Sequence, residues 1–184
     1  MTAPRPAGAA PRGANPLSRV DDMVIGIDPG LASTGYALIA GPPSRPRVVA
    51  IGTVKTSPRT DHPLRLRALH DAIADLCCDH PVEAAAIEAW FVHPVSRSAM
   101  GMAEARGAIL VALAGAGVDV VEYSPNTIKQ SVTGSGSADK VQVRTMVQRL
   151  TGTAPETDHA ADALAAAICH MSSAPLRGAI RRAR

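Results

Sequence analysis

Aromatic residues are scarce in this chain: Phe, Trp and Tyr together make up only 2% of its 184 residues. The four of them are Tyr36, Trp90, Phe91 and Tyr123. Proteins that hold single strands or RNA by stacking successive bases need several aromatic side chains on one surface. The scarcity excludes such a platform and leaves Ala, Val, Leu and Ile to build the hydrophobic core.

Cysteines and long apolar segments are also few. The three cysteines, Cys77, Cys78 and Cys169, form no Cys-x-x-Cys pair, as expected for small buried side chains in a reducing compartment. The longest apolar stretch, residues 108–118, is interrupted by glycines and is too short to span a membrane. The arginines near the N-terminus precede no apolar segment of the kind found in secretory signals. We therefore expect a soluble, cytoplasmic protein whose length suits one domain.

The excess of positive charge lies at the two ends of the chain. The formal net charge is +3, but residues 1–22 hold three Arg and two Asp, and residues 175–184 hold four Arg and no acid. The middle of the chain is left with 12 basic and 14 acidic residues. This near-neutral middle does not exclude an anionic partner, because association depends on where charges cluster on the surface.

Composition divides the chain into three parts. Residues 1–22 are rich in Ala, Pro, Gly and Arg, and their closely spaced prolines predict a disordered arm. Residues 175–184 predict a flexible basic tail for the same reason. Residues 23–174 have regular hydrophobic patterns and no internal repeat, so we expect them to form the folded domain.

The order of elements in this domain predicts an α/β fold. Strand-like apolar segments occur first in a close group of three, which favours an antiparallel meander, and then alternate with helices. Such an order is typical of a five-stranded mixed sheet flanked by helices. The expected strands are residues 23–28, 36–40, 48–55, 82–88 and 118–123. The expected helices are residues 64–76, 96–115, one beginning near Pro125, one opened by Ser137 as its N-cap, and one over about 157–171.

Two carboxylates end apolar strands, where buried apolar residues are otherwise expected. Asp28 follows Val-Ile-Gly-Ile, and Glu88 follows Ala-Ala-Ala-Ile. A buried carboxylate needs hydrogen bonds, an opposite charge or a metal ion. If the two strands are neighbours, the carboxylates converge, and their repulsion calls for a cation between them. For Asp28 alone, the alternative is that it caps the Asp-Pro-Gly turn that it opens.

The last predicted helix adds further candidate ligands. His159 and Asp162 are three residues apart, and Asp158 and Asp162 are four apart, so either pair shares one helical face. Spacing alone does not choose between His159 and Asp158, and an acid at a helix start also interacts favourably with the helix dipole. Oxygen ligands with at most one imidazole suit Mg²⁺ or Mn²⁺ better than structural zinc.

Five motifs, taken in order, resemble the RuvC family of bacterial Holliday-junction resolvases. They are Gly-Ile-Asp-Pro-Gly-x-x-x-x-Gly-Tyr (26–36), Ile-Glu-x-x-Phe (87–91), Ala-Arg-Gly (105–107), Lys-x-x-Val-x-Gly-x-Gly-x-Ala-x-Lys-x-x-Val (129–143) and Asp-His-Ala-Ala-Asp-Ala-Leu-Ala (158–165). The resemblance extends over about residues 23–171. It implies an RNase H-like fold and a homodimer that nicks two opposing strands of a four-way DNA junction symmetrically, leaving 5′-phosphate and 3′-hydroxyl ends. It also implies RuvA and RuvB, the branch-migration proteins, as partners.

Symmetric nicking needs two sites on one particle, and the small-residue helix 96–115 is a candidate for the dimer interface.

The family's acidic site, carried over residue by residue, falls on Asp28, Glu88, Asp162 and His159. Many members have Asp at the fourth of these positions, and others have His as here. The resemblance implies phosphodiester hydrolysis assisted by two Mg²⁺ ions, with Asp28 bridging both and Glu88 and Asp162 holding one each. His159 is expected to bind metal and to orient or deprotonate the attacking water. Because imidazole lowers the negative charge of the site by one, a more pronounced dependence on Mn²⁺ is expected.

Other family positions imply contacts with DNA. Lys129 and Lys140 are two of only three lysines and match family lysines near the scissile phosphate. Phe91 matches a phenylalanine that stacks on a base at the junction centre. Arg106, in the Ala-Arg-Gly motif, is expected to neutralise a buried carboxylate or to contact DNA. Outside the motifs, Arg97 is a candidate for contact with a phosphate from its expected loop. Without the resemblance, the lysines are interpreted as solvated residues at helix ends and the aromatic pair as core.

Two other functions fit parts of the pattern. The first motif also resembles the phosphate-binding turn of the actin and sugar-kinase superfamily, but the chain is short for two such domains and lacks a second Gly-rich turn. If His159 prevents metal binding, the chain would instead be a non-catalytic module that binds junctions.

Overall fold

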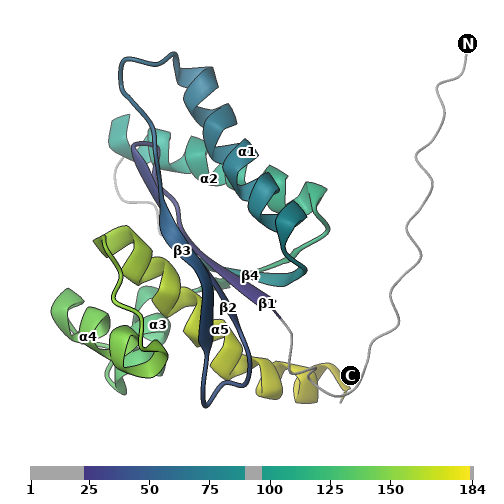
Figure 1. Cartoon of the computed structure of the whole chain (residues 1–184), viewed down its shortest axis with the longest axis vertical. Coiled ribbons are helices and arrows are strands. Elements are labelled where there is room, and N and C mark those ends of the chain that lie inside the picture. The colour runs from purple at the N-terminus through teal and green to yellow at the C-terminus, as the bar shows by residue number, and fades with distance from the viewer. Residues whose placement is uncertain (1–22, 90–96, 183–184) are drawn as a thin grey trace, which may run out of the picture.

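The computed structural model describes residues 23–89 and 97–182, with side chains described through residue 173 except at 97 and 98. This part of the chain forms three layers, in which a central sheet separates two groups of helices (Figure 1). On one face lie α1 (His62–Asp79) and α2 (Arg97–Gly115). On the other lie α3 (Pro125–Thr133), α4 (Lys140–Thr151) and α5 (Asp158–Arg182). Each face of the sheet has its own hydrophobic core.

The sheet has five strands and mixed pairing, as the order of elements predicts. Its strands lie in the order β3-β2-β1-β4-β5. The first three pair antiparallel as a meander, while β4 pairs parallel with both β1 and β5. This order makes β1 and β4 neighbours, so both end at the same edge of the sheet. The strands are β1 (Met23–Asp28), β2 (Ser33–Ala40), β3 (Arg47–Lys55), β4 (Val82–Glu88) and β5 (Asp119–Tyr123).

Helix α5 lies unusually close to the sheet, because small residues meet on both sides of the contact. A Cβ at Gly26 would overlap the carbonyl oxygen of Ala163, and a Cβ at Gly35 would overlap that of His159. Only glycine leaves room for backbone to approach backbone in this way. The alanines of α5 from Ala160 to Ala167 are almost wholly buried. A core of small side chains therefore replaces the bulky aromatic core that the composition excludes.

Several boundaries differ from the expectations, three of them for reasons that the structure shows. Helix α4 begins after Asp139 and not after Ser137, because Asp139 accepts a hydrogen bond from the Gln142 N–H (2.8 Å) while the Gln142 side chain accepts one from the Asp139 N–H. Ser137 has no Glu or Gln three residues later to complete a capping box, and its hydroxyl hydrogen-bonds that of Ser135. Strand β2 begins at Ser33, before the apolar residues, because its first residues pair with the end of β3.

The third difference is the length of α5, which continues as helix to Arg182. The helix thus enters the segment for which composition predicted a flexible tail. The residues after Pro175 include Leu, Arg and Ala, which have high helix propensity. The predicted arm at residues 1–22 lies outside the described residues. Among the helices that the structure describes, none is both long and apolar enough to cross a membrane.

Candidate active site

Two of the predicted ligands lie side by side at one edge of the sheet. Asp28 is the last residue of β1 and Glu88 the last residue of β4. The strands pair in parallel, with Ile27 opposite Ile87. The two carboxylates therefore follow equivalent positions on adjacent strands, as expected from the way each interrupts an apolar run.

Helix α5 brings His159 and Asp162 to the same edge. Its first turn crosses β2 at Gly35, beneath the carbonyl of His159, and Gly35 is itself paired with Asp28. The imidazole Nδ1 of His159 lies 2.6 Å from Oδ2 of Asp28. A carboxylate only accepts hydrogen bonds, so Nδ1–H is the donor and Nε2 keeps its lone pair when the ring is neutral. Of the two candidate partners for Asp162, His159 is the one that contacts Asp28.

The three carboxylates share a low-dielectric, negatively charged environment. Burial is the largest cause that raises the pKa of each of Asp28, Glu88 and Asp162. The charge of Asp28 raises the pKa of both Glu88 and Asp162 further. Hydrogen bonding and charge from His159 act in the opposite direction on Asp28. Carboxylates that repel one another in this way are a favourable environment for a cation.

Both predicted lysines act on this cluster. The charge of Lys140 lowers the pKa of all three carboxylates, and the charge of Lys129 lowers that of Glu88. Lys129 belongs to α3, and Lys140 is the first residue of α4, where the capping box fixes the helix start. Two lysines therefore flank the acidic cluster from a second pair of helices.

The donor set has the chemistry of a divalent hard-cation site. Three carboxylates and one imidazole suit Mg²⁺ or Mn²⁺. Within the described part of the chain, however, the observed side-chain positions bring no three His, Cys, Asp or Glu residues together around one ion. The hydrogen bond between Asp28 and His159 occupies one oxygen and one nitrogen of the set. Metal binding would therefore require these side chains to reorient, while the backbone already places them at one edge.

Arg106 lies behind the site and not among the carboxylate heads. Its Nη1 donates to the main-chain oxygen of Glu88 (3.2 Å), and its Nη2 pairs with the carboxylate of Glu122 (2.5 Å). The Arg106 side chain is only 12% exposed. It thus ties α2 to the ends of β4 and β5, next to the backbone that carries Glu88.

Two of the predicted DNA contacts are not placed by the structure. Phe91 lies outside the described residues. Arg97 is the first residue of α2, and its side chain is not described. Both remain predictions.

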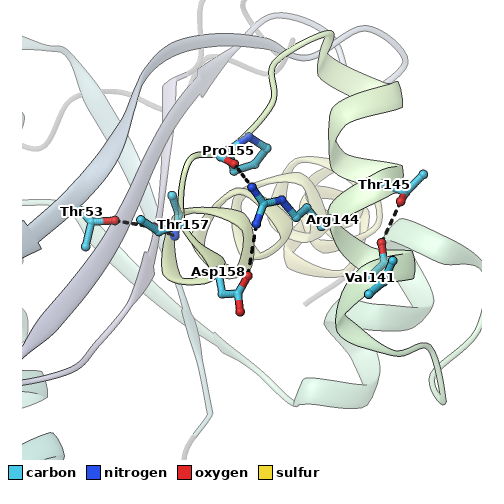
Figure 2. Close-up of polar contacts among 8 residues, drawn as sticks. Thr53, Val141, Arg144, Thr145, Pro155, Thr157 and Asp158 are labelled. Atoms are coloured by element: carbon cyan, nitrogen blue, oxygen red, sulfur yellow. Dashed lines mark hydrogen bonds and ion pairs between the residues drawn. The ribbon is translucent and has the colours of Figure 1, made fainter.

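A set of contacts around the start of α5 was not anticipated from the sequence (Figure 2). Asp158, expected to interact with the helix dipole, is the first residue of α5 and pairs with Arg144 of α4 (3.3 Å). Arg144 also donates to the main-chain oxygen of Pro155 (2.6 Å), and Thr53 hydrogen-bonds Thr157 (2.6 Å). The spacing of Lys140 and Arg144 indicates a shared face of α4, but only the fold shows what that face contacts.

Comparisons with known proteins identify the family. A family model described as crossover junction endodeoxyribonuclease RuvC matches residues 24–170. A protein of that name from Syntrophomonas wolfei is 42% identical over 152 residues, covering 82% of this chain and 88% of the relative. Another from Alkalilimnicola ehrlichii is 44% identical over 161 residues, covering 87% of this chain and 97% of the relative.

Solved structures show the same fold. Thermus thermophilus RuvC in complex with Holliday junction substrate is similar with a TM-score of 0.81 and 34% identity, covering 85% of this chain and 97% of that one. The yeast mitochondrial Holliday junction resolvase, at 12% identity and a TM-score of 0.63, shares the RNase H-like fold, with 90% of this chain and 86% of that one covered. The match extends over all four acidic-site positions. This chain belongs to the RuvC family of crossover junction endodeoxyribonucleases.

Proposed function

We propose that this protein is an endonuclease that resolves four-way DNA junctions in recombination and repair, by symmetric nicks in two opposing strands. The observation that carries the proposal is the convergence of Asp28, Glu88, His159 and Asp162 at one edge of the sheet, in a chain of the RuvC family. The similar Thermus thermophilus protein was solved with a Holliday junction substrate, which supports the choice of DNA structure. The nucleotide-binding alternative has no comparable support.

We infer that the acidic cluster holds two divalent cations, Mg²⁺ or Mn²⁺. Asp28 would contact both ions, and Glu88 and Asp162 would hold one each. When bound, such ions lower the pKa of a water and stabilise the charge that develops on the leaving 3′ oxygen. Their positive charge would also offset the repulsion that raises the pKa of the three carboxylates.

His159 would serve as a ligand or as the base that activates water. Its Nδ1–H donates to Asp28, which leaves Nε2 free to accept a proton or, once the side chains reorient, to bind metal. Replacing a family Asp by His removes one negative charge from the site. Mn²⁺ binds imidazole more readily than Mg²⁺ does, so the proposal includes a preference for Mn²⁺.

The reaction is hydrolysis of a phosphodiester. Water oxygen bonds to phosphorus, the bond from phosphorus to the 3′ oxygen breaks, and the departing oxygen takes a proton. The products carry 5′-phosphate and 3′-hydroxyl ends. Lys129 and Lys140 would pair with phosphate oxygens beside the cluster and stabilise charge in the transition state.

Symmetric cleavage requires a second copy of the chain. Exposed apolar side chains on α2, Met100 and Val111 at 55% and 64% exposure, support this helix as part of the homodimer interface. Phe91 of each copy would stack at the junction centre, and Arg97 would contact a phosphate. RuvA and RuvB would be partners in the cytoplasm.

The decisive test is cleavage of a labelled four-way junction in Mg²⁺ and in Mn²⁺. We expect paired nicks with ligatable ends, abolished by Asp28→Asn while junction binding persists, because that change removes a charge that repels DNA. Binding without product in either ion would favour the non-catalytic module. ATP binding without junction affinity would refute the proposed function altogether.

A further inference from the structure

Helix α4 carries two cationic residues on one face, and they act on different parts of the site. Lys140 is its first residue, and its charge lowers the pKa of Asp28, Glu88 and Asp162. Arg144 lies four residues further on and therefore projects from the same face. Arg144 is not among the main causes of the pKa shifts of the three carboxylates. Its contacts are instead with the segment that precedes α5 and with the first residue of that helix.

Arg144 binds the segment that leads into α5, as Figure 2 shows. Its Nη2 donates to the main-chain oxygen of Pro155 at 2.6 Å, and its Nη1 lies 3.3 Å from the carboxylate of Asp158. The ion pair is exposed, with side chains 44% and 61% accessible, so it contributes little. Pro155 is buried, and a charge-assisted bond to its carbonyl is the stronger of the two contacts.

A second contact holds the start of α5 from the opposite side. The hydroxyl of Thr53, on β3, lies 2.6 Å from that of Thr157. Thr157 also accepts a hydrogen bond from the Ala160 N–H (3.1 Å), in the manner of a helix N-cap. The first turn of α5 is therefore held between β3 and α4.

We propose that Arg144 is a positioning residue for the metal ligands on α5. The proposal rests on the proposed function, since it gives Arg144 a role at that same site. Residues 155–158 lead directly into the turn that carries His159 and Asp162. Fixing this segment to α4 sets the position of both ligands relative to Asp28. Because Lys140 also belongs to α4, it sets their position relative to Lys140 as well. Arg144 acts by this route without touching the reacting groups.

The test compares Arg144→Gln with Arg149→Gln, which removes the same charge from the same helix. Mn²⁺ binding to the free protein, followed by electron paramagnetic resonance, is the first readout. We expect Arg144→Gln to raise the Mn²⁺ dissociation constant about 10-fold, as changes behind metal ligands commonly do, and Arg149→Gln to leave it unchanged. Arg144→Lys, which can still donate to the Pro155 carbonyl, should restore part of the affinity.

Cleavage supplies the second readout. At saturating junction, Arg144→Gln should lower kcat and raise the Mg²⁺ concentration needed for half-maximal rate. Junction affinity, measured in Ca²⁺, should fall equally in the two Gln variants. A larger loss of junction affinity in Arg144→Gln, with unchanged Mn²⁺ binding, would make Arg144 a DNA contact and overturn the proposal.

A neutral variant keeps the proposal testable if Arg144→Gln fails to fold. Thr53→Val removes the contact with Thr157 from the other side of the same segment without altering charge, and it should weaken Mn²⁺ binding in the same direction. Unchanged Mn²⁺ binding in folded Thr53→Val would show that this segment does not position the ligands and would overturn the proposal. A wild-type protein that binds Mn²⁺ but cuts no junction would refute the proposed function and still allow the Mn²⁺ comparison to test Arg144.

Discussion

Gly35 of β2 lies directly beneath the main-chain carbonyl of His159, so close that a Cβ at position 35 would overlap that oxygen. The contact fixes the height of α5 above the sheet at the residue that hydrogen-bonds Asp28. The candidate site is therefore set by backbone packing as well as by the identity of the predicted ligands.

Gly35→Ala should lift the first turn of α5 and separate His159 from Asp28. Overpacking of this kind costs about 1–3 kcal/mol of the free energy of unfolding. We expect a lower melting temperature and a loss of junction cleavage that exceeds the loss of junction binding. Gly115→Ala is the matched control, because a Cβ there meets nothing within 4 Å. Normal cleavage by folded Gly35→Ala would show that the close approach is unimportant for the site.

The candidate ligands at the strand ends were predictable, because core packing does not explain a carboxylate that follows an apolar strand. Asp28 and Glu88 stand out for that reason, and the order of elements already makes their strands candidates for neighbours. Which residue of α5 faces Asp28 was not predictable from periodicity, since spacings of three and four residues share a face. The contact of Gly35 with α5 decides it, and that contact joins residues far apart in the sequence. The contacts of Arg144 depend on the path of residues 152–157, which have no regular pattern.

Asp162→Asn should stabilise the metal-free protein at neutral pH. Burial first, and then the charge of Asp28, raises the pKa of Asp162 above its ordinary value of 3.8. The folded state thus binds this proton more tightly than the unfolded state. The resulting stability is fully present below pH 3.8 and is lost as pH rises through the folded pKa.

Melting temperatures in EDTA check this sign. Asp162→Asn should melt above wild type at pH 7, and the difference should shrink as pH falls toward 4. Mg²⁺ should raise the melting temperature of wild type and have less effect on the variant, because a ligand that binds only the folded state stabilises it. A variant that melts below wild type at pH 7 in EDTA would mean that the Asp162 carboxylate stabilises the fold.

His159→Asp should shift the metal preference of cleavage toward Mg²⁺. The change restores the residue that many family members have and adds one negative charge to the cluster. Hard oxygen ligands favour Mg²⁺ relative to imidazole. The ratio of the rate in Mn²⁺ to the rate in Mg²⁺ should therefore fall. An unchanged ratio would indicate that His159 does not ligate metal and acts only on the attacking water.

Lys140→Gln should reduce the rate of cleavage more than the affinity for the junction. Among the described lysines and arginines, Lys140 is the one whose charge is among the main causes that lower the pKa of Asp28, so its ammonium group acts close to the acidic cluster. Removing a group that stabilises transition-state charge costs roughly 10²–10³-fold in kcat. Lys55→Gln is the control: Lys55 is exposed at the end of β3 and is not among the main causes of the pKa shifts of the three carboxylates. It should weaken binding slightly and leave the rate for bound junction unchanged. Equal losses in both variants would reduce Lys140 to a general contributor of positive charge.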